Sequence, residues 1–431
     1  MAMTGSERRL QSGFTWLVAG NVLYAACQWG IVWVLARLGS TEQVGQYALG
    51  MAVSAPIMLF GNFQLRALIA SDLNEEYSLG QYLSFRFVSI AVATGVIAIS
   101  AWSIGRSAIS ASVIALVGAA QALDFVSESY YGIMQRERRL DRLSWSLLIK
   151  GPLALGCLAA AMYATRNILY ALGSLAIGRL LVLLLWDSRL GFAGRELKAG
   201  LVWDWPRVRG LLRLALPLGL ISMLVSVNAG IPRYFLEVYR GSSDLGIFAA
   251  IASLLTAGTL IVSSLGQSLF VPVAQACAAG DRARYRWFLF YAVVIGAGLG
   301  AAAVLVALGA GQKILATLFG PEYGSHSRLL VLLMLAGAVS YIASGLGYVM
   351  TAARSLTPQI PVMAAAAVAA VGASAWLIPV YGLEGAALAL MISTLLQLAG
   401  TVLILMRIDR SLQSQAQAPL ALAHYAEGAA R

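Results

Sequence analysis

The sequence predicts an all-α integral membrane protein with about twelve transmembrane helices arranged as two related halves. Composition is the first observation: 60% of the 431 residues are hydrophobic and only 11% are charged. The mean hydropathy is +0.79, and apolar surface on this scale exceeds what a single soluble core can bury. The spacing of the apolar runs and an internal repeat are the second and third observations.

Twelve apolar runs are long enough to cross a bilayer, which takes about 20 residues of helix. In the first half they lie near 12–36, 44–65, 81–103, 110–134, 144–164 and 168–186. In the second half they lie near 211–235, 245–276, 284–309, 327–352, 360–380 and 384–406. The first run is uncharged to Ala36, too long for the core of a signal peptide, so we interpret it as a spanning helix.

The repeat connects the two halves. The segment VLARLGSTEQVGQYA, from Val34, aligns with FLEVYRGSSDLGIFA, from Phe235, at a constant offset of 201 residues. The alignment matches Leu35 with Leu236 and Gly45 with Gly246. Six helices is an even number, so both halves have the same orientation, and their pseudo-twofold axis should run along the membrane normal.

Four domains follow from this organisation. Residues 1–187 form an N-terminal six-helix lobe and residues 211–407 a C-terminal six-helix lobe. Between them, residues 188–210 mix tryptophan with basic residues, which is typical of an amphipathic helix in the cytoplasmic headgroup layer. Residues 408–431 are rich in alanine and glutamine and are predicted to be a disordered cytoplasmic tail.

Basic residues predict the orientation. Loops on the N-terminal side carry 20 of the 30 lysines and arginines, and loops on the opposite side carry 7. Both termini are therefore predicted to be cytoplasmic. The formal net charge of +11 could indicate nucleic acid, but the basic residues are dispersed between apolar spans. Membrane lipids are the expected partners, and nucleic acid is not.

Charged residues inside the predicted spans are the candidate site. Arg86, Glu128, Lys150 and Arg179 lie on four successive spans, each roughly 10–13 Å from the cytoplasmic end at about 1.5 Å per residue. Asp124 lies one turn deeper than Glu128 on the same helix face. Any one of these cations could extend back to the headgroups instead. Four helices with charges at one depth favour a shared polar cavity, because intramembrane charges are costly.

The residue types predict what the cavity binds. Arginine matches phosphate oxygens in pairs and lysine adds a point charge, so Arg86, Lys150 and Arg179 are predicted to bind a phosphorylated head. Asp124 and Glu128 are their predicted counter-ions in the empty state and a predicted link to a proton gradient. Arg233, at the outer rim of the seventh span, is predicted to receive the head afterwards. Candidate cavity-lining residues are Asn21, Tyr24, Gln121 and Asn228. No metal, cofactor or catalytic residue is expected.

Several segments resemble a known family: LARLGSTEQVGQYALGMAVSAPIMLFGNFQLR, YYGIMQRERRLDRLSWSLLIKG, LPLGLISMLVSVNAGIPRYFLE and LGIFAAIAS. They are similar to the polysaccharide (Wzx-type) flippases of the multidrug/oligosaccharidyl-lipid/polysaccharide exporter superfamily. The resemblance implies two pseudo-twofold-related six-helix lobes around a central cavity that opens alternately to each side. It also implies an undecaprenyl-pyrophosphate-linked oligosaccharide cargo for O-antigen, capsule or exopolysaccharide, moved across the bacterial inner (cytoplasmic) membrane. The polysaccharide polymerase machinery is a further expected partner.

Other functions remain open in the sequence. Lipid II flippases of the superfamily have arginines in the first helix, whereas this chain is uncharged from Thr15 to Ala36. A multidrug-type cation antiporter needs an acidic site, for which Asp124 and Glu128 remain candidates. A membrane-embedded polymerase or glycosyltransferase would need sizeable outer loops with acidic or histidine residues. The chain has two histidines and short outer loops, which favours a transporter and not an enzyme.

Overall fold

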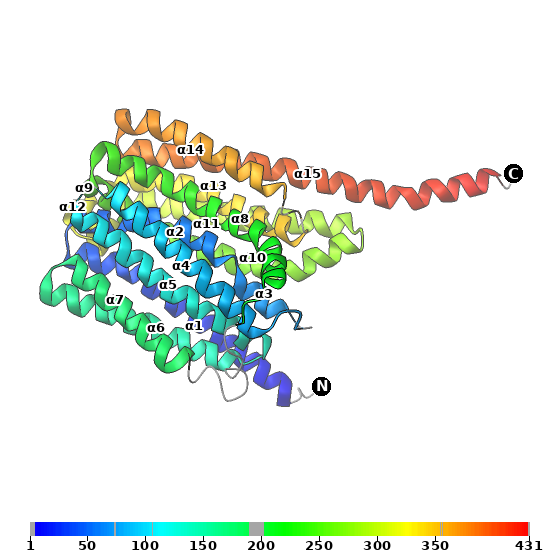
Figure 1. Ribbon diagram of the computed structural model, residues 1–431. Helices are drawn as coiled ribbons and strands as arrows, with labels where there is room; N and C mark the ends of the chain where they lie inside the picture. The colour runs from blue at the N-terminus through cyan, green and yellow to red at the C-terminus, as the bar shows by residue number, and fades with distance from the viewer. Residues whose placement is uncertain are drawn as a thin grey trace. The chain divides into compact units, whose positions relative to one another are not determined.

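The computed structural model describes residues 5–72, 75–105, 107–188, 202–353, 355 and 357–429, with side chains from Thr15 to Gln413 within these ranges. Every regular element in these ranges is a helix (Figure 1). Packing divides the chain into two units, Met1–Ala250 (unit 1) and Ile251–Arg431 (unit 2). Within the described ranges, twelve helices are long and apolar enough to cross a membrane, which confirms a multi-pass membrane protein.

Unit 1 is an all-helical bundle. Its elements are α1 (Gly5–Leu38), α2 (Thr41–Asn62), α3 (Leu65–Ser71), α4 (Leu79–Ile104), α5 (Ala108–Arg136), α6 (Leu140–Thr165), α7 (Ile168–Val182), the π-helical turn η1 (Leu183–Asp187), α8 (Trp205–Arg240) and α9 (Ser242–Ala252), which crosses the division after Ala250. Two spans begin at capping boxes, Ser40 with Gln43 and Ser78 with Gln81, which bond otherwise unpaired backbone groups of the first turn.

The second span breaks near its end. Helix α2 stops at Asn62, because Phe63 and Gln64 both adopt left-handed backbone with φ near 50° and 52°. Helix α3 then resumes at Leu65. The break leaves the last carbonyl groups of α2 without helical partners, and one of them takes part in the site described below.

Unit 2 contains the remaining helices. They are α10 (Leu255–Ala278), α11 (Arg282–Leu318), the short α12 (Pro321–Gly324), α13 (Ser327–Ala352), α14 (Gln359–Tyr381) and α15 (Leu383–Ala429). Small residues let α11 and α13 approach closely: a Cβ on Gly296 would meet the backbone of Ile342, and one on Gly300 would meet Ala338. Close approach of this kind drives helix association in a bilayer, where hydrophobicity alone cannot.

All twelve predicted spans are confirmed, while some boundaries differ. Helix α8 begins at Trp205, before the predicted residue 211, and most of the predicted 188–210 linker lies outside the described residues. Helix α15 continues to Ala429 where a disordered tail is predicted, since alanine, leucine and glutamine are good helix formers. The division by packing falls after Ala250, whereas the predicted lobes follow the repeat, and the lobe assignment stays a prediction.

The repeated segments meet inside unit 1. A Cβ on Gly45 would collide with the backbone oxygen of Ser242, and a Cβ on Gly246 would collide with that of Thr41. Thr41 and Ser242 are themselves related by the offset of 201. The hydroxyls of Thr41 and Ser243 lie 2.8 Å apart beside this contact. The contact is therefore reciprocal, as expected when two related segments pair about a local twofold axis.

Candidate functional site: a buried charge cluster in unit 1

Asp124, in the middle of α5, is shared by two cations. Arg179 Nη1, from α7, lies 2.6 Å from Asp124 Oδ2. Lys150 Nζ, from α6, lies 3.2 Å from Asp124 Oδ1. The same ammonium lies 3.9 Å from Asp187 Oδ2, at the end of η1. These four residues are named the Asp124 cluster.

The Asp124 cluster is electrically balanced and almost completely buried. Two cations face two carboxylates, so its formal charge is zero. The Lys150 and Asp187 side chains are 2% and 0% exposed, and Arg179 is 6% exposed. Asp124 is the most accessible member at 17%. Removing one charge would leave another buried without a partner, which is the costly case in a low-dielectric interior.

Hydrogen bonds hold Asp124 and Arg179 in place. Tyr24, on α1, donates its hydroxyl to Asp124 Oδ2 at 3.1 Å. Gln28 Nε2 donates to Tyr24 at 2.6 Å, and Gln28 Oε1 accepts from Arg179 Nη2 at 3.1 Å. Arg179 also donates to the backbone oxygen of Ala120 at 3.0 Å. The ring from Asp124 through Tyr24 and Gln28 to Arg179 fixes the plane of the guanidinium.

A second set of bonds holds Asp187 and Lys150. Ser146 donates to Asp187 Oδ1 at 2.5 Å, and the hydroxyls of Ser146 and Tyr131 lie 2.8 Å apart. Lys150 Nζ lies 5.3 Å from the centre of the Tyr131 ring, within cation–π range. The π-helical turn η1 places Asp187, since such turns shift the following side chain around the helix and often occur at functional sites.

Asp187 is a member that the sequence prediction missed. The predicted sixth span ends at residue 186, which leaves Asp187 just outside the span, as the last residue of the predicted N-terminal lobe. Its spacing was an available signal, because it lies eight residues after Arg179, close to two helical turns of about 3.6 residues each. Charge balance was another: the prediction placed three cations, Arg86, Lys150 and Arg179, against only two carboxylates.

Arg86 forms a neighbouring cluster. Its side chain is fully buried in α4 and donates through Nη1 to the backbone oxygen of Asn62 at 3.1 Å and to Asn62 Oδ1 at 2.6 Å. Its Nε donates to Ser129 at 2.8 Å. Asn62 Nδ2 donates in turn to Glu128 at 3.0 Å, so in the described contacts Asn62 connects Arg86 to Glu128. The break in α2 after Asn62 supplies the backbone acceptor.

The two clusters lie along one helix. Asp124 and Glu128 are four residues apart on α5, and therefore on one face of it. Arg86 Nη2 and Arg179 Nε are buried and have no hydrogen-bond partner among the described residues. Each guanidinium thus keeps one nitrogen whose N–H groups the described protein groups do not use.

The other predicted site residues lie in varied surroundings. Of the lining candidates, Tyr24 is part of the network around Asp124. Asn21 is exposed and bonds the backbone of its own helix at Leu17. Gln121 donates to Ser54 at 2.9 Å. Asn228 is buried on α8, and Arg233, five residues further along, is half-buried.

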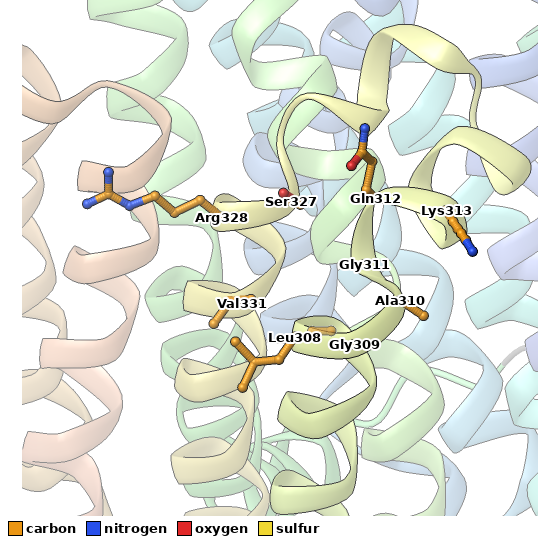
Figure 2. Close-up of a pocket in the computed structure, with 10 residues that line it drawn as sticks. Leu308, Gly309, Ala310, Gly311, Gln312, Lys313, Ser327, Arg328 and Val331 are labelled. Atoms are coloured by element: carbon orange, nitrogen blue, oxygen red, sulfur yellow. The ribbon is translucent and has the colours of Figure 1, made fainter.

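Unit 2 has a groove of about 480 Å³ between the end of α11 and the start of α13, lined by small and apolar residues and by two cations, Lys313 and Arg328. Arg328 lies 3.4 Å from Glu384. Figure 2 shows that Arg328 and Lys313 point in opposite directions, so their charges do not converge on one ligand. This groove lacks the convergent cations of the Asp124 cluster.

The geometry of the Asp124 cluster suits exchange of one anion for another. An arginine fork binds carboxylate and phosphate with the same two-bond geometry. A phosphate that took the place of Asp124 would keep Lys150 and Arg179 paired, while Asp187 would remain beside Lys150. Lys150 and Arg179 are too buried to meet a ligand in this conformation, so the exchange requires movement of Asp124 or of the helices around it.

Comparisons with known proteins agree with this architecture. A family model for polysaccharide biosynthesis proteins matches residues 10–276. The capsular polysaccharide biosynthesis protein CapF of Staphylococcus aureus is 29% identical over 383 residues, which cover 88% of this chain and 95% of CapF. An inward-facing MATE family multidrug resistance transporter of the MOP superfamily matches with a TM-score of 0.72 and 14% identity, over 91% of this chain and 95% of that one.

The lipid II flippase MurJ, in an inward closed conformation, matches with a TM-score of 0.71 and 11% identity, over 92% of this chain and 90% of that one. The structural matches confirm the predicted twelve-helix fold. The predicted roles of the site residues remain predictions.

Proposed function

The chain belongs to the polysaccharide biosynthesis protein family, and from this premise we propose that it is a flippase for a lipid-linked oligosaccharide. The proposed cargo is an undecaprenyl-pyrophosphate-linked repeat unit, moved from the inner to the outer leaflet of the bacterial cytoplasmic membrane. The relative CapF is by its name a capsular polysaccharide biosynthesis protein, which favours capsule among the possible surface polysaccharides.

One observation carries the proposal: Lys150 and Arg179 converge on a single carboxylate, Asp124, inside a membrane-spanning bundle. Two cations that share one exchangeable anion are suited to a pyrophosphate, which presents several oxygens and more than one negative charge. Arg86 would extend this surface along α5 with its unused Nη2 donor. The glycan itself would need only polar and aromatic contacts.

The same exchange supports coupling to a proton gradient. When the pyrophosphate takes Lys150 and Arg179, Asp124 loses both cationic partners and its charged form is destabilised. A proton would then neutralise it, as burial favours the uncharged acid. Alternating access would deliver the head to the outer side, where Arg233 is proposed to receive it. A change of state can follow from binding only because the ligand favours one state over the other.

A cation antiporter fits the cluster less well. Organic-cation export would need a carboxylate free to pair with the drug. Asp124 already contacts two protein cations and accepts from Tyr24. A cationic drug would therefore have to compete with Lys150 and Arg179 for the same oxygens.

Deletion of the gene in its native host tests the proposal. Complete repeat units should accumulate on inner-leaflet carrier lipid, and plasmid-borne wild-type protein should restore surface polysaccharide. Carrier lipid is extracted, and its head groups are analysed by mass spectrometry. Absence of the repeat unit itself would indicate a biosynthetic enzyme. Normal polysaccharide with increased sensitivity to cationic dyes would indicate drug export, and either result contradicts the proposal.

A further inference from the structure

Unit 2 carries a second groove, of about 430 Å³, whose walls change from charged to apolar along its length. On α11 it is lined by Arg282, Arg286, Leu289 and Val293, which share one helix face. The α11 wall extends over about 16 Å at about 1.5 Å per residue. Leu346 of α13, buried, closes the floor.

Helix α15 supplies the opposite wall, and its charged and apolar residues lie at the same ends of the groove as those of α11. Its apolar lining residues are Val402, Leu405 and Met406, and its polar ones, Asp409, Arg410 and Gln413, follow. Val293 is 37% exposed and Met406 is 52% exposed, so the apolar end opens to the exterior of unit 2. Both residues fall in or at the end of the predicted spans.

The charged end has a surplus of positive charge. Arg282 donates to the Asp409 carboxylate through Nε at 2.9 Å and through Nη2 at 2.7 Å. Arg286 donates to the same carboxylate through Nε and Nη2, each at 2.9 Å. With Arg410, three arginines face one carboxylate in the lining, a net charge of +2. Arg286 is 58% exposed and Arg410 is also exposed, so both can reach a ligand.

The position of these arginines increases the surplus. Arg282 and Arg286 lie in the first two turns of α11, where the helix dipole is already positive. A cation there is unfavourable unless an anion lies close. Asp409 supplies one, and each guanidinium still has its Nη1 donors outside the contacts with Asp409.

We propose that this groove binds one anionic phospholipid of the cytoplasmic leaflet. The phosphate head would lie against Arg286 and Arg410, and one acyl chain would follow Leu289, Val293 and Met406. A soluble phosphate would leave the apolar wall unused, and an acidic peptide would have to enter the hydrocarbon region. Only a lipid matches a cationic mouth joined to an apolar channel in the predicted span. The site is separate from the Asp124 cluster, which lies in unit 1.

Native mass spectrometry of the full chain in detergent, titrated with dioleoyl phosphatidylglycerol, tests the site. Arg286→Gln/Arg410→Gln removes the two exposed mouth cations and leaves the pair of Arg282 with Asp409. Arg284→Gln/Arg407→Gln is the matched control, because it removes two exposed cations from the same helices outside the groove lining. The mouth variant should bind the lipid about tenfold more weakly than the control, the effect of losing a charge-assisted contact.

A second pair of variants tests the chain channel. Val293→Trp places a bulky side chain in the groove, whereas Val294→Trp adds the same side chain at an exposed neighbour outside the lining. Only Val293→Trp should weaken phosphatidylglycerol binding. If the two double arginine variants lost lipid affinity equally, binding would reflect general attraction to a cationic surface, and the groove would not be a specific site. Equal binding of dioleoyl phosphatidylcholine, or an intact affinity in Val293→Trp together with displacement by inorganic phosphate, would also overturn the proposal.

Discussion

At the scale of residues, the central feature is that Asp124 has two cationic partners and Lys150 has two carboxylate partners. The four charges form a chain in which each inner member is shared, so no single pair can be removed without disturbing another. Such a network is well suited to a switch between two states, because one further anion would compete with Asp124 for Lys150 and Arg179 and so change which charges are paired. It also complicates mutagenesis, since loss of one buried charge costs about 3–5 kcal/mol of stability.

The exchange model predicts that Arg179→Lys impairs transport without loss of folding. Lysine keeps the positive charge beside Asp124, but its single nitrogen cannot take both positions from which Arg179 Nη1 reaches Ala120 and Nη2 reaches Gln28, and it cannot bind phosphate through a fork. Export of surface polysaccharide in a deletion host should fall about tenfold, the equivalent of about 1.4 kcal/mol. Immunoblotting of membranes should show unchanged protein.

Arg328→Lys is the matched control, because Arg328 is 81% exposed and pairs with Glu384 far along the chain from the cluster. It should export normally. Alanine at Arg86, Lys150 and Arg179 together should abolish export. Normal export by that triple variant, at normal membrane levels, would mean that these cations have no role in cargo binding.

At the scale of elements, helix ends and irregular turns place the site. The left-handed pair Phe63 and Gln64 ends α2 so that Asn62 can bond Arg86, and η1 turns Asp187 toward Lys150. The spans themselves were predictable from hydropathy, since a run of about 20 apolar residues is a strong signal. The break in α2 was not, because averaging over a whole span hides two residues of unusual backbone. Asp187 was missed for a related reason: a charge at the end of a span fits the headgroup layer as well as a buried pair.

The reciprocal contact of Gly45 and Gly246 predicts that alanine at either position lowers stability, the opposite of its usual effect in a helix. Replacing a helical glycine with alanine normally stabilises a helix by about 1 kcal/mol. Gly45→Ala and Gly246→Ala should instead destabilise the protein, because the new methyl group would collide with backbone oxygen atoms that cannot rotate away. Thermal unfolding of detergent-solubilised protein, followed by size-exclusion chromatography, measures the shift in midpoint.

Gly173→Ala is the control for these two variants. Gly173 lies in α7 with open space where a Cβ would be, so its substitution should leave the midpoint unchanged or raise it. If all three variants shift the midpoint in the same direction, the contact between α2 and α9 does not constrain the fold as the structure indicates.

At the scale of the whole molecule, the contact between the two repeated segments is also a place where alternating access can be tested. The offset of 201 residues in the sequence predicts that Gly45 and Gly246 are equivalent. In the structure Gly45 packs against Ser242, in the first turn of α9, and Gly246 packs against Thr41, in the first turn of α2. Sequence could indicate the equivalence because both segments retain the glycine. It could not indicate that the equivalent segments touch, since contact depends on packing between distant parts of the chain.

Cross-linking at this contact tests alternating access. Thr41→Cys/Ser243→Cys places two thiols where hydroxyls now lie 2.8 Å apart, at helix starts predicted to face outward. If the outer side must open to release the cargo, this contact separates once in each cycle. Oxidation should therefore abolish export, and reduction with dithiothreitol should restore it, while each single cysteine variant exports under both conditions. The Ser243→Cys variant should also react with a membrane-impermeant maleimide from outside, as the orientation requires. Full export by a completely cross-linked protein would show that α2 and α9 stay together throughout transport, and an outward opening at this contact would be wrong.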